Sequence, residues 1–331
     1  MNNSKRTVII KHPSFERGRA ALSLAMDGGV RGQIIFVVGL SGVGKSEIRY
    51  AVMRSFAGAP SHWKGQLPAM AVRATPSDRS SFSPKEFMTR LYLELHEPDF
   101  SWAAPRTVVN GPDEGHSRID ARLKNPLWND PRIKYPEHRP RAFVERTALA
   151  RGVRAIFVEE AASLTYTHRL KQPGDHMVNY MCLAEEIDAT LVMFGVPRVA
   201  ALWEGNAEIQ RRSRFVFVER YRLDKSGDRE AFERLAVSIA SRFRFSRRDL
   251  VRRGLDLAYA SSVGVFGELS AYYERADDLR ARDGDAFISW QHLQNAVSTE
   301  AMLTTLHNDA TLFDMLRTPA KENVIRKVLR R

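Results

Sequence analysis

The chain has 331 residues, of which 44% are hydrophobic and 27% charged, and its mean hydropathy is −0.35. This composition is typical of a soluble globular protein, and no apolar run approaches the roughly 20 residues that cross a bilayer. A single cysteine, Cys182, excludes an intramolecular disulfide and a cysteine metal cluster. The N-terminal segment lacks the apolar region of a secretory signal, so we expect a cytoplasmic protein without a membrane segment.

The charge balance is strongly basic. Lysine and arginine number 51, aspartate and glutamate 39, which gives a formal charge of +12 and a pI near 10.0. Such an excess favours polyanionic partners, because neutralising phosphates releases condensed counterions. We therefore expect a nucleic acid as partner, although the same excess also serves solubility.

Five strand-like segments alternate with helical patterns, which predicts βαβ units and a parallel sheet. The segments cover residues 32–39, 69–74, 155–160, 189–195 and 214–219. The first is almost continuous in β-branched and aromatic residues, as expected of a strand that is buried on both faces. Together with the motif GLSGVGKS that follows the first strand, at residues 39–46, five such strands resemble the usual sheet of a P-loop domain of the AAA+ class.

The helical and irregular segments between and after these strands indicate how the chain is divided into domains. Ser83 and Pro84 predict the start of a helix whose residues Phe87, Leu91 and Leu95 face the core. The next segment is rich in proline, glycine and charge, which indicates a functional insertion or disorder, and after residue 223 only helical patterns follow. We predict an α/β core at 1–223 with an irregular insertion at 98–141, a small helical lid at 224–303 and a basic tail at 304–331.

A complete P-loop motif, Gly39-Leu-Ser-Gly-Val-Gly-Lys-Ser46, lies between the first strand and a helix. Its backbone amides are expected to surround the β-phosphate of ATP at the positive end of the helix dipole. Lys45 is expected to reach the β- and γ-phosphates, and the Ser46 hydroxyl to bind Mg²⁺. The residues predicted to line the nucleotide are Gly39, Ser41, Gly42, Val43, Gly44, Lys45, Ser46 and Glu47.

The apolar strand at 155–160 ends in two carboxylates, Glu159 and Glu160. In P-loop enzymes the first supports Mg²⁺ through water and the second polarises the attacking water as general base. We assign Glu159 to the metal and Glu160 to catalysis. Glu159 is one methylene longer than the usual aspartate, which leaves the metal geometry and the hydrolysis rate open.

Three arginines precede the last strand. Oligomeric ATPases place an arginine here that reaches the γ-phosphate in the neighbouring subunit, since a guanidinium is always charged and binds bidentately. We predict Arg214 for this role, with Arg211 and Arg212 as alternatives; a basic helix end that binds its own terminal carbonyls is the structural alternative. The end of the fourth strand, 194–196, and the turn Gly264-Val-Phe-Gly267 carry no sensor side chain, so sensors stay unassigned.

Taken together, these motifs resemble the TniB and TnsC family of transposition ATPases. The resemblance covers roughly residues 12–303 and is most like TnsC of CRISPR-associated transposons. It rests on HPSFERGRAAL, GLSGVGKS, IFVEEAASL, FGVPRVAALWEGN, the SRF junction and the VGVFGEL turn. In FGVPRVAAL, a valine replaces the threonine that is usual in the family's turn.

The resemblance implies an ATPase that assembles into rings or filaments around double-stranded DNA. Such a protein links a target-selection protein of the TniQ type to a transposase. It also implies DNA contacts from the ATPase domain, near and after the second strand, through phosphates rather than bases. The positions that match this region are Arg73, Arg79, Lys85, Lys124, Arg132 and Lys134.

Other functions fit the same motifs. A helicase loader or an origin-binding ATPase would also act on DNA, although the roughly 30 residues after 303 are too few for a winged-helix domain. A protein-directed ATPase switch would need no DNA at all. A metabolic kinase would leave the helical lid and the arginines before the last strand unexplained.

Overall fold

The computed structural model describes residues 12–28, 32–76, 81–103, 138–167, 172–247 and 249–329. The chain forms two compact units, which are described separately. The first contains Met1–Val38 and Lys45–Val216, and the second contains Gly39–Gly44 and Phe217–Arg331. One boundary therefore falls within the P-loop motif and another within the last strand. No helix in the described part of the chain is long and apolar enough to span a membrane.

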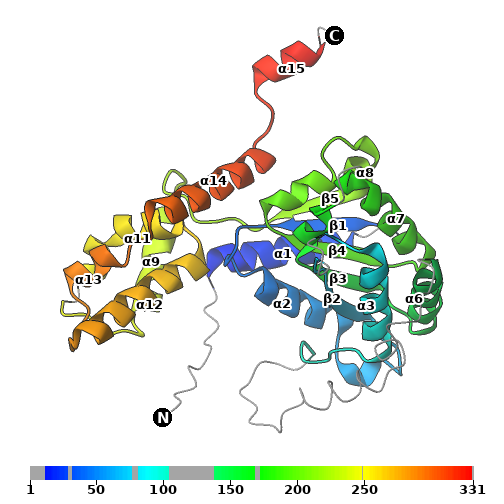
Figure 1. Cartoon of the computed structure of the whole chain (residues 1–331), viewed down its shortest axis with the longest axis horizontal. Helices are drawn as coiled ribbons and strands as arrows, with labels where there is room; N and C mark the ends of the chain where they lie inside the picture. The colour runs from blue at the N-terminus through cyan, green and yellow to red at the C-terminus, as the bar shows by residue number, and fades with distance from the viewer. Residues whose placement is uncertain are drawn as a thin grey trace. The chain divides into compact units, whose positions relative to one another are not determined.

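A five-stranded sheet with the order β2-β3-β4-β1-β5 forms the centre of the first unit (Figure 1). Its strands are β1 (Ile34–Val38), β2 (Ala69–Arg73), β3 (Ala155–Glu159), β4 (Thr190–Gly195) and β5 (Ser213–Phe217). The pairs β2–β3, β3–β4 and β4–β1 are parallel. Strands β1 to β4 lie inside their predicted ranges, and β5 begins one residue before its range. The predicted parallel α/β sheet is confirmed.

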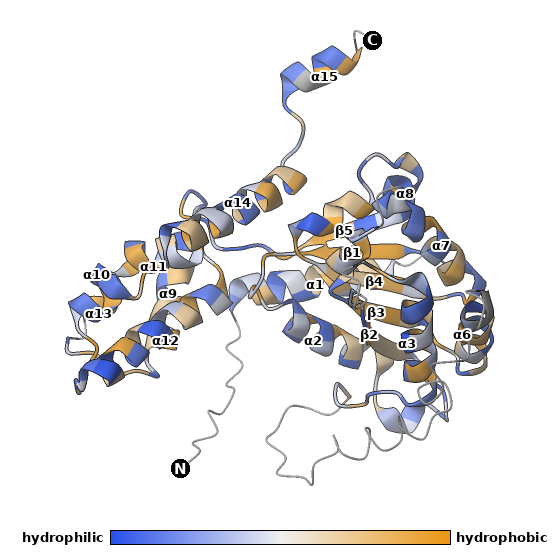
Figure 2. Ribbon diagram, in the orientation of Figure 1, coloured by the Kyte–Doolittle hydropathy of each residue, from blue (hydrophilic) through white to orange (hydrophobic). Residues whose placement is uncertain are grey.

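The strands are apolar in sequence because their side chains are buried in the core. All five residues of β1 are fully buried, and the strands carry the hydrophobic colours in Figure 2. The ring of Phe36 in β1 lies 4.6 Å from that of Trp203 and 5.8 Å from that of Phe215, centroid to centroid. Continuous apolar strands of this kind need helices on both faces, which the alternating pattern supplies.

The helices of the first unit surround this sheet. They are α1 (Pro13–Asp27), α2 (Lys45–Ala57), α3 (Pro84–His96), α6 (His138–Ala150), α7 (Pro173–Glu186) and α8 (Ala207–Arg212), with short 3₁₀ turns η1 (Pro60–His62), η2 (Ala161–Thr165) and η3 (Pro197–Leu202). The Ser83 hydroxyl accepts a hydrogen bond from the Glu86 amide at 3.3 Å, and Phe87, Leu91 and Leu95 are buried, as predicted. Of the insertion predicted at 98–141, residues 104–137 lie outside the described residues.

The second unit is helical after β5. Its helices are α9 (Asp228–Ala240), α10 (Leu250–Arg253), α11 (Leu255–Ser262), α12 (Phe266–Asp283), α13 (Trp290–Asn295), α14 (Glu300–Arg317) and α15 (Glu322–Leu329). Helix α14 continues through residue 303, the predicted end of the lid. Phe313 of this helix is fully buried, and its ring lies 5.9 Å from that of Phe217, in an edge-to-face arrangement.

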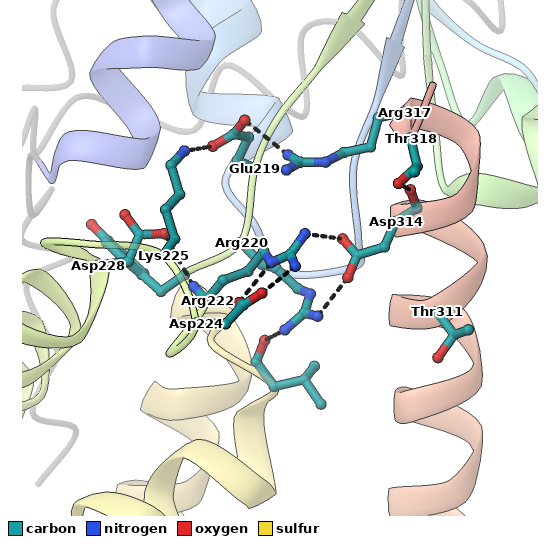
Figure 3. A network of polar contacts seen from close by, with 12 residues as sticks. Glu219, Arg220, Arg222, Asp224, Lys225, Asp228, Thr311, Asp314, Arg317 and Thr318 are labelled. Atoms are coloured by element: carbon teal, nitrogen blue, oxygen red, sulfur yellow. Dashed lines mark hydrogen bonds and ion pairs between the residues drawn. The ribbon is translucent and has the colours of Figure 1, made fainter. Parts of the chain in front are cut away.

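Ion pairs attach α14 to the segment that follows β5 (Figure 3). The Asp314 carboxylate lies 2.7 Å from Nη2 of Arg220 and 4.0 Å from Nη1 of Arg222. Arg317 pairs with Glu219 at 2.8 Å. Arg220 also donates to the carbonyl of Val263 and the hydroxyl of Tyr259, at 3.1 and 3.0 Å. This guanidinium therefore joins three parts of the unit.

A buried histidine begins the first helix. His12 is the N-cap of α1, and its Nδ1 accepts a hydrogen bond from the Phe15 amide at 3.4 Å. Burial, together with the positive charge of Arg17, lowers the pKa of His12 from 6.5 to about 4. The folded protein thus holds this ring neutral at a pH at which the unfolded chain already protonates it.

We expect this difference in pKa to destabilise the protein in weak acid. As the pH falls from 6.5 towards 4, the unfolded state takes up a proton that the folded state does not, and at pH 5 the loss is about 1–2 kcal/mol. In His12→Asn the cap acceptor stays and the titrating group is gone. The change in unfolding temperature between pH 7 and pH 5 should therefore be smaller in this variant; an equal change in both proteins would contradict the assignment.

Candidate nucleotide-binding site

The P-loop has the backbone that its glycines predict. Gly42 and Gly44 have φ angles of +75° and +97°, a region that side chains disfavour. A Cβ on Gly39 would lie 2.8 Å from the Val43 side chain, so this position also requires a glycine. In the same unit, the Gly267 amide at the start of α12 donates to the carbonyl of Gly42 at 2.9 Å. The predicted turn Gly264-Val-Phe-Gly267 thus contacts the loop by its backbone.

Lys45 begins α2 directly after this loop, and Ser46 and Glu47 follow in its first turn. Lys45 is partly buried, while Ser46 is exposed. Burial lowers the pKa of Lys45 to about 8, and the negative charge of Glu160 opposes this shift. The lysine and the predicted general base are therefore close enough to interact through their charges, although 115 positions separate them in the sequence.

Glu160 follows the last residue of β3 and has a left-handed backbone with φ of +54°. Its side chain is about half exposed, and its carboxylate lies 3.7 Å from Nη2 of Arg73. Arg73 ends β2, beside Glu159 in the register of the two strands. Parallel strands end at the same edge of a sheet, which brings Arg73 and the two glutamates together. The sequence predicts only a DNA contact for Arg73.

Glu159 does not stand as an isolated metal ligand. Its Oε1 accepts a hydrogen bond from Nε of Arg49 at 2.9 Å, and Arg49 is 4% exposed. Arg49 is not among the site residues predicted from the sequence. One feature of the sequence points to Arg49: it lies on α2 between Ile48 and Val52, which are both buried. A charged side chain on a buried face needs a partner of opposite charge.

These residues suit a nucleotide. The left-handed glycines allow a loop whose amides surround an anion, and the partly buried Lys45 is a cation that a phosphate would stabilise. In the described ranges, no three His, Cys, Asp or Glu side chains are grouped so that they could hold a metal ion.

The three arginines at the junction of α8 and β5 differ in their surroundings: Arg211 and Arg212 end α8, and Arg214 lies in β5. Arg214 donates to the carbonyls of Ala25 and Gly28 at the end of α1, at 3.1 and 2.7 Å. Arg212 pairs with Glu185 and Glu208. Arg211 is exposed, and no residue in the described part of the chain pairs with it. Arg214 and Arg212 thus make contacts within their own unit. Such contacts fit the structural alternative, in which basic residues bind the terminal carbonyls of a helix.

The end of β4 carries Phe194, Gly195 and Val196, as the sequence indicated, and η3 follows at once. Arg198 of η3 is not among the site residues predicted from the sequence. Its Nη1 donates to the Tyr166 hydroxyl at 2.5 Å, and its guanidinium lies 5.6 Å from the centre of that ring. Tyr166 follows the turn after β3, so Arg198 is held beside the segment that carries the two glutamates.

Only two of the predicted DNA contacts fall in the described ranges. Arg73 has an exposed side chain, and Lys85 lies in the first turn of α3, partly exposed. Arg79, Lys124, Arg132 and Lys134 lie outside the described residues. The DNA contacts at all six positions therefore stay a prediction.

No protein-family model and no curated protein matches the sequence. Among solved structures, the ORC1 protein of Aeropyrum pernix in complex with DNA is similar at a TM-score of 0.56 and 14% identity, covering 89% of this chain and 67% of that one. Cdc6p from Pyrobaculum aerophilum is similar at a TM-score of 0.54 and 12% identity, covering 91% and 72%. At these identities the likeness concerns the fold alone. The chain has the fold of P-loop AAA+ ATPases, with a five-stranded sheet and a helical C-terminal region.

Proposed function

We propose that this protein is an AAA+ ATPase that acts on DNA. The observation that carries the proposal is the P-loop, in which the left-handed Gly42 and Gly44 are followed directly by Lys45 at the start of α2. Glu160, the predicted general base, follows β3. A cation for the phosphates and a carboxylate for the attacking water are the two groups that ATP hydrolysis needs from the protein.

The roles follow from the chemistry of each group. Lys45 would bind the β- and γ-phosphates, and the Ser46 hydroxyl would bind Mg²⁺, which when present neutralises charge on the phosphates. Glu160 would accept a proton from the attacking water. Glu159 is already paired with Arg49, so its proposed support of Mg²⁺ competes with that ion pair.

Double-stranded DNA is the proposed partner because of the formal charge of +12 and the fold. The similar ORC1 structure is described as a complex with DNA. Contacts to phosphates by exposed residues such as Arg73 and Lys85 would give affinity that depends on salt rather than on sequence.

At a finer level, we propose a regulator of DNA transposition of the TnsC and TniB type. It would form homo-oligomers on DNA, with an arginine of one subunit at the nucleotide of the next, and would link a TniQ-type protein to a transposase. The motifs from HPSFERGRAAL to VGVFGEL support this proposal. Of the three arginines, Arg211 is the best placed to reach a neighbouring subunit, because Arg212 and Arg214 are bound within their own.

A second candidate is an ATPase of DNA replication, such as an origin binder or a helicase loader. The names of the two similar structures, ORC1 and Cdc6p, favour it. A switch that acts on a protein partner alone would bind ATP but ignore DNA.

Electron microscopy separates these functions. The purified protein is imaged with short duplex DNA and a slowly hydrolysed ATP analogue, with each ligand alone, and with neither. Rings or filaments that need both ligands are the expected result. Particles that ignore DNA would refute the proposed action on DNA. If assembly succeeds, retention of a transposase but not of a helicase on these assemblies would favour transposition, and the reverse would favour replication.

A further inference from the structure

A buried charge lies beside the proposed nucleotide site. Arg49 is 4% exposed, one turn after Lys45 on α2. Burying a guanidinium without a partner costs several kcal/mol, so the contacts of Arg49 should reveal what it does. The proposed binding of ATP, binding of DNA and oligomerisation give no role to Arg49.

The contacts of Arg49 are specific. Its Nε donates to Oε1 of Glu159 at 2.9 Å, and its Nη1 lies 3.3 Å from the sulfur of Met53. Its guanidinium carbon lies 4.2 Å from the centre of the Tyr50 ring. In the described part of the chain, Glu159 is the one carboxylate that pairs with Arg49, and Arg49 the one cation that pairs with Glu159.

Because of this ion pair, Mg²⁺ and Arg49 would compete for the Glu159 carboxylate. A metal that used Glu159 would share a carboxylate whose negative charge a neighbouring guanidinium already balances. If the metal drew the carboxylate away, the buried cation would lose its partner, which strongly destabilises a protein. The gain from the metal would have to exceed that cost.

We propose that Arg49 is a positioning residue that fixes the Glu159 carboxylate in an ion pair and withdraws it from Mg²⁺, so that nucleotide binding depends only weakly on the metal. The inference rests on the proposed ATP-binding function. It replaces the role first assigned to Glu159, and it leaves Ser46 as the protein's own ligand for the metal.

The test compares nucleotide affinity with excess Mg²⁺ and with EDTA, using a fluorescent ADP analogue. The ratio of the two dissociation constants is measured in the wild type and in Glu159→Gln, Arg49→Met and the double variant. We expect this ratio in Glu159→Gln to agree with that of the wild type within about threefold. In Arg49→Met the freed carboxylate should raise the dependence on Mg²⁺ by about tenfold, and the double variant should lose this gain, as for other contacting pairs in double-mutant cycles.

Arg54→Met is the matched control, because it removes an arginine from the same helix outside the proposed site. It should keep the ratio of the wild type. Thermal unfolding shows whether each variant is folded. Should Arg49→Met not fold, Glu159→Gln still decides, because its amide oxygen can accept the hydrogen bond from Arg49.

Two outcomes would overturn the inference in different ways. If Glu159→Gln lowers the dependence on Mg²⁺ by about tenfold, Glu159 serves the metal in spite of Arg49, and only this inference fails. If the wild type binds no nucleotide with or without Mg²⁺, the proposed ATPase function fails together with it.

Discussion

Replacing Lys45 with alanine is expected to weaken ATP binding by about a hundredfold and to prevent ATP-dependent assembly. The lysine supplies a charge-assisted contact to the phosphates, and such contacts contribute about 1.5–3 kcal/mol. Because burial lowers its pKa to about 8, the free protein loses this charge as the pH rises above 8. ATP affinity in the wild type should therefore fall above that pH, and Lys45→Ala should lose this pH dependence. A fluorescent ATP analogue measures both effects.

The matching change at Glu160 separates binding from hydrolysis. Glu160→Gln should bind ATP and slow hydrolysis by about 10²–10⁴-fold, since it removes a general base, and should hold the ATP-bound assembly. Lys321→Ala removes an exposed lysine that precedes α15 and lies outside the proposed site, and this variant should bind ATP as the wild type does. If Lys45→Ala and Glu160→Gln both assemble and hydrolyse ATP normally, the proposed site is wrong.

Replacing Asp314 with alanine is expected to lower the free energy of unfolding by about 2–4 kcal/mol. The change leaves Arg220, whose side chain is 15% exposed, without its carboxylate, and breaking a buried pair from one side costs about 3–5 kcal/mol. We place the effect below the top of that range because Asp314 is 22% exposed and water reaches it. Urea unfolding followed by circular dichroism measures the loss.

Asp309 on the same helix provides the control, because it is exposed and removing it should change stability by less than about 0.5 kcal/mol. Replacing Arg220 by methionine together with Asp314→Ala should recover part of the loss, since no buried charge then remains unpaired. Equal stabilities of Asp314→Ala and Asp309→Ala would contradict the role of this ion pair in attaching α14.

The sheet and the P-loop could be predicted because their signals are local. Residues 34–38 are apolar without interruption, which only a strand buried on both faces explains, and the glycines of 39–44 are needed wherever the loop has a left-handed backbone. The glutamates at the end of β3 were found for the same reason, since an apolar strand precedes them directly. For Ser83, too, the cap and its helix lie within one turn.

The partners of the charged residues could not be predicted, because they are distant in sequence. Arg214, which is predicted to serve a neighbouring subunit, donates to the carbonyls of Gly28 and Ala25, 186 and 189 positions earlier in its own chain. Arg49 reaches Glu159 across 110 positions. A sequence pattern gives the face of a helix on which a charge lies, but not the element that packs against that face.

The left-handed backbone of Glu160 has a consequence for stability. A side chain with a Cβ is held in this region at a cost on the order of 1 kcal/mol, which glycine would avoid and asparagine would reduce. The fold would therefore be more stable with another residue at the end of β3. This protein accepts that cost at the position of its proposed general base, and backbone strain of this kind is often kept at functional sites.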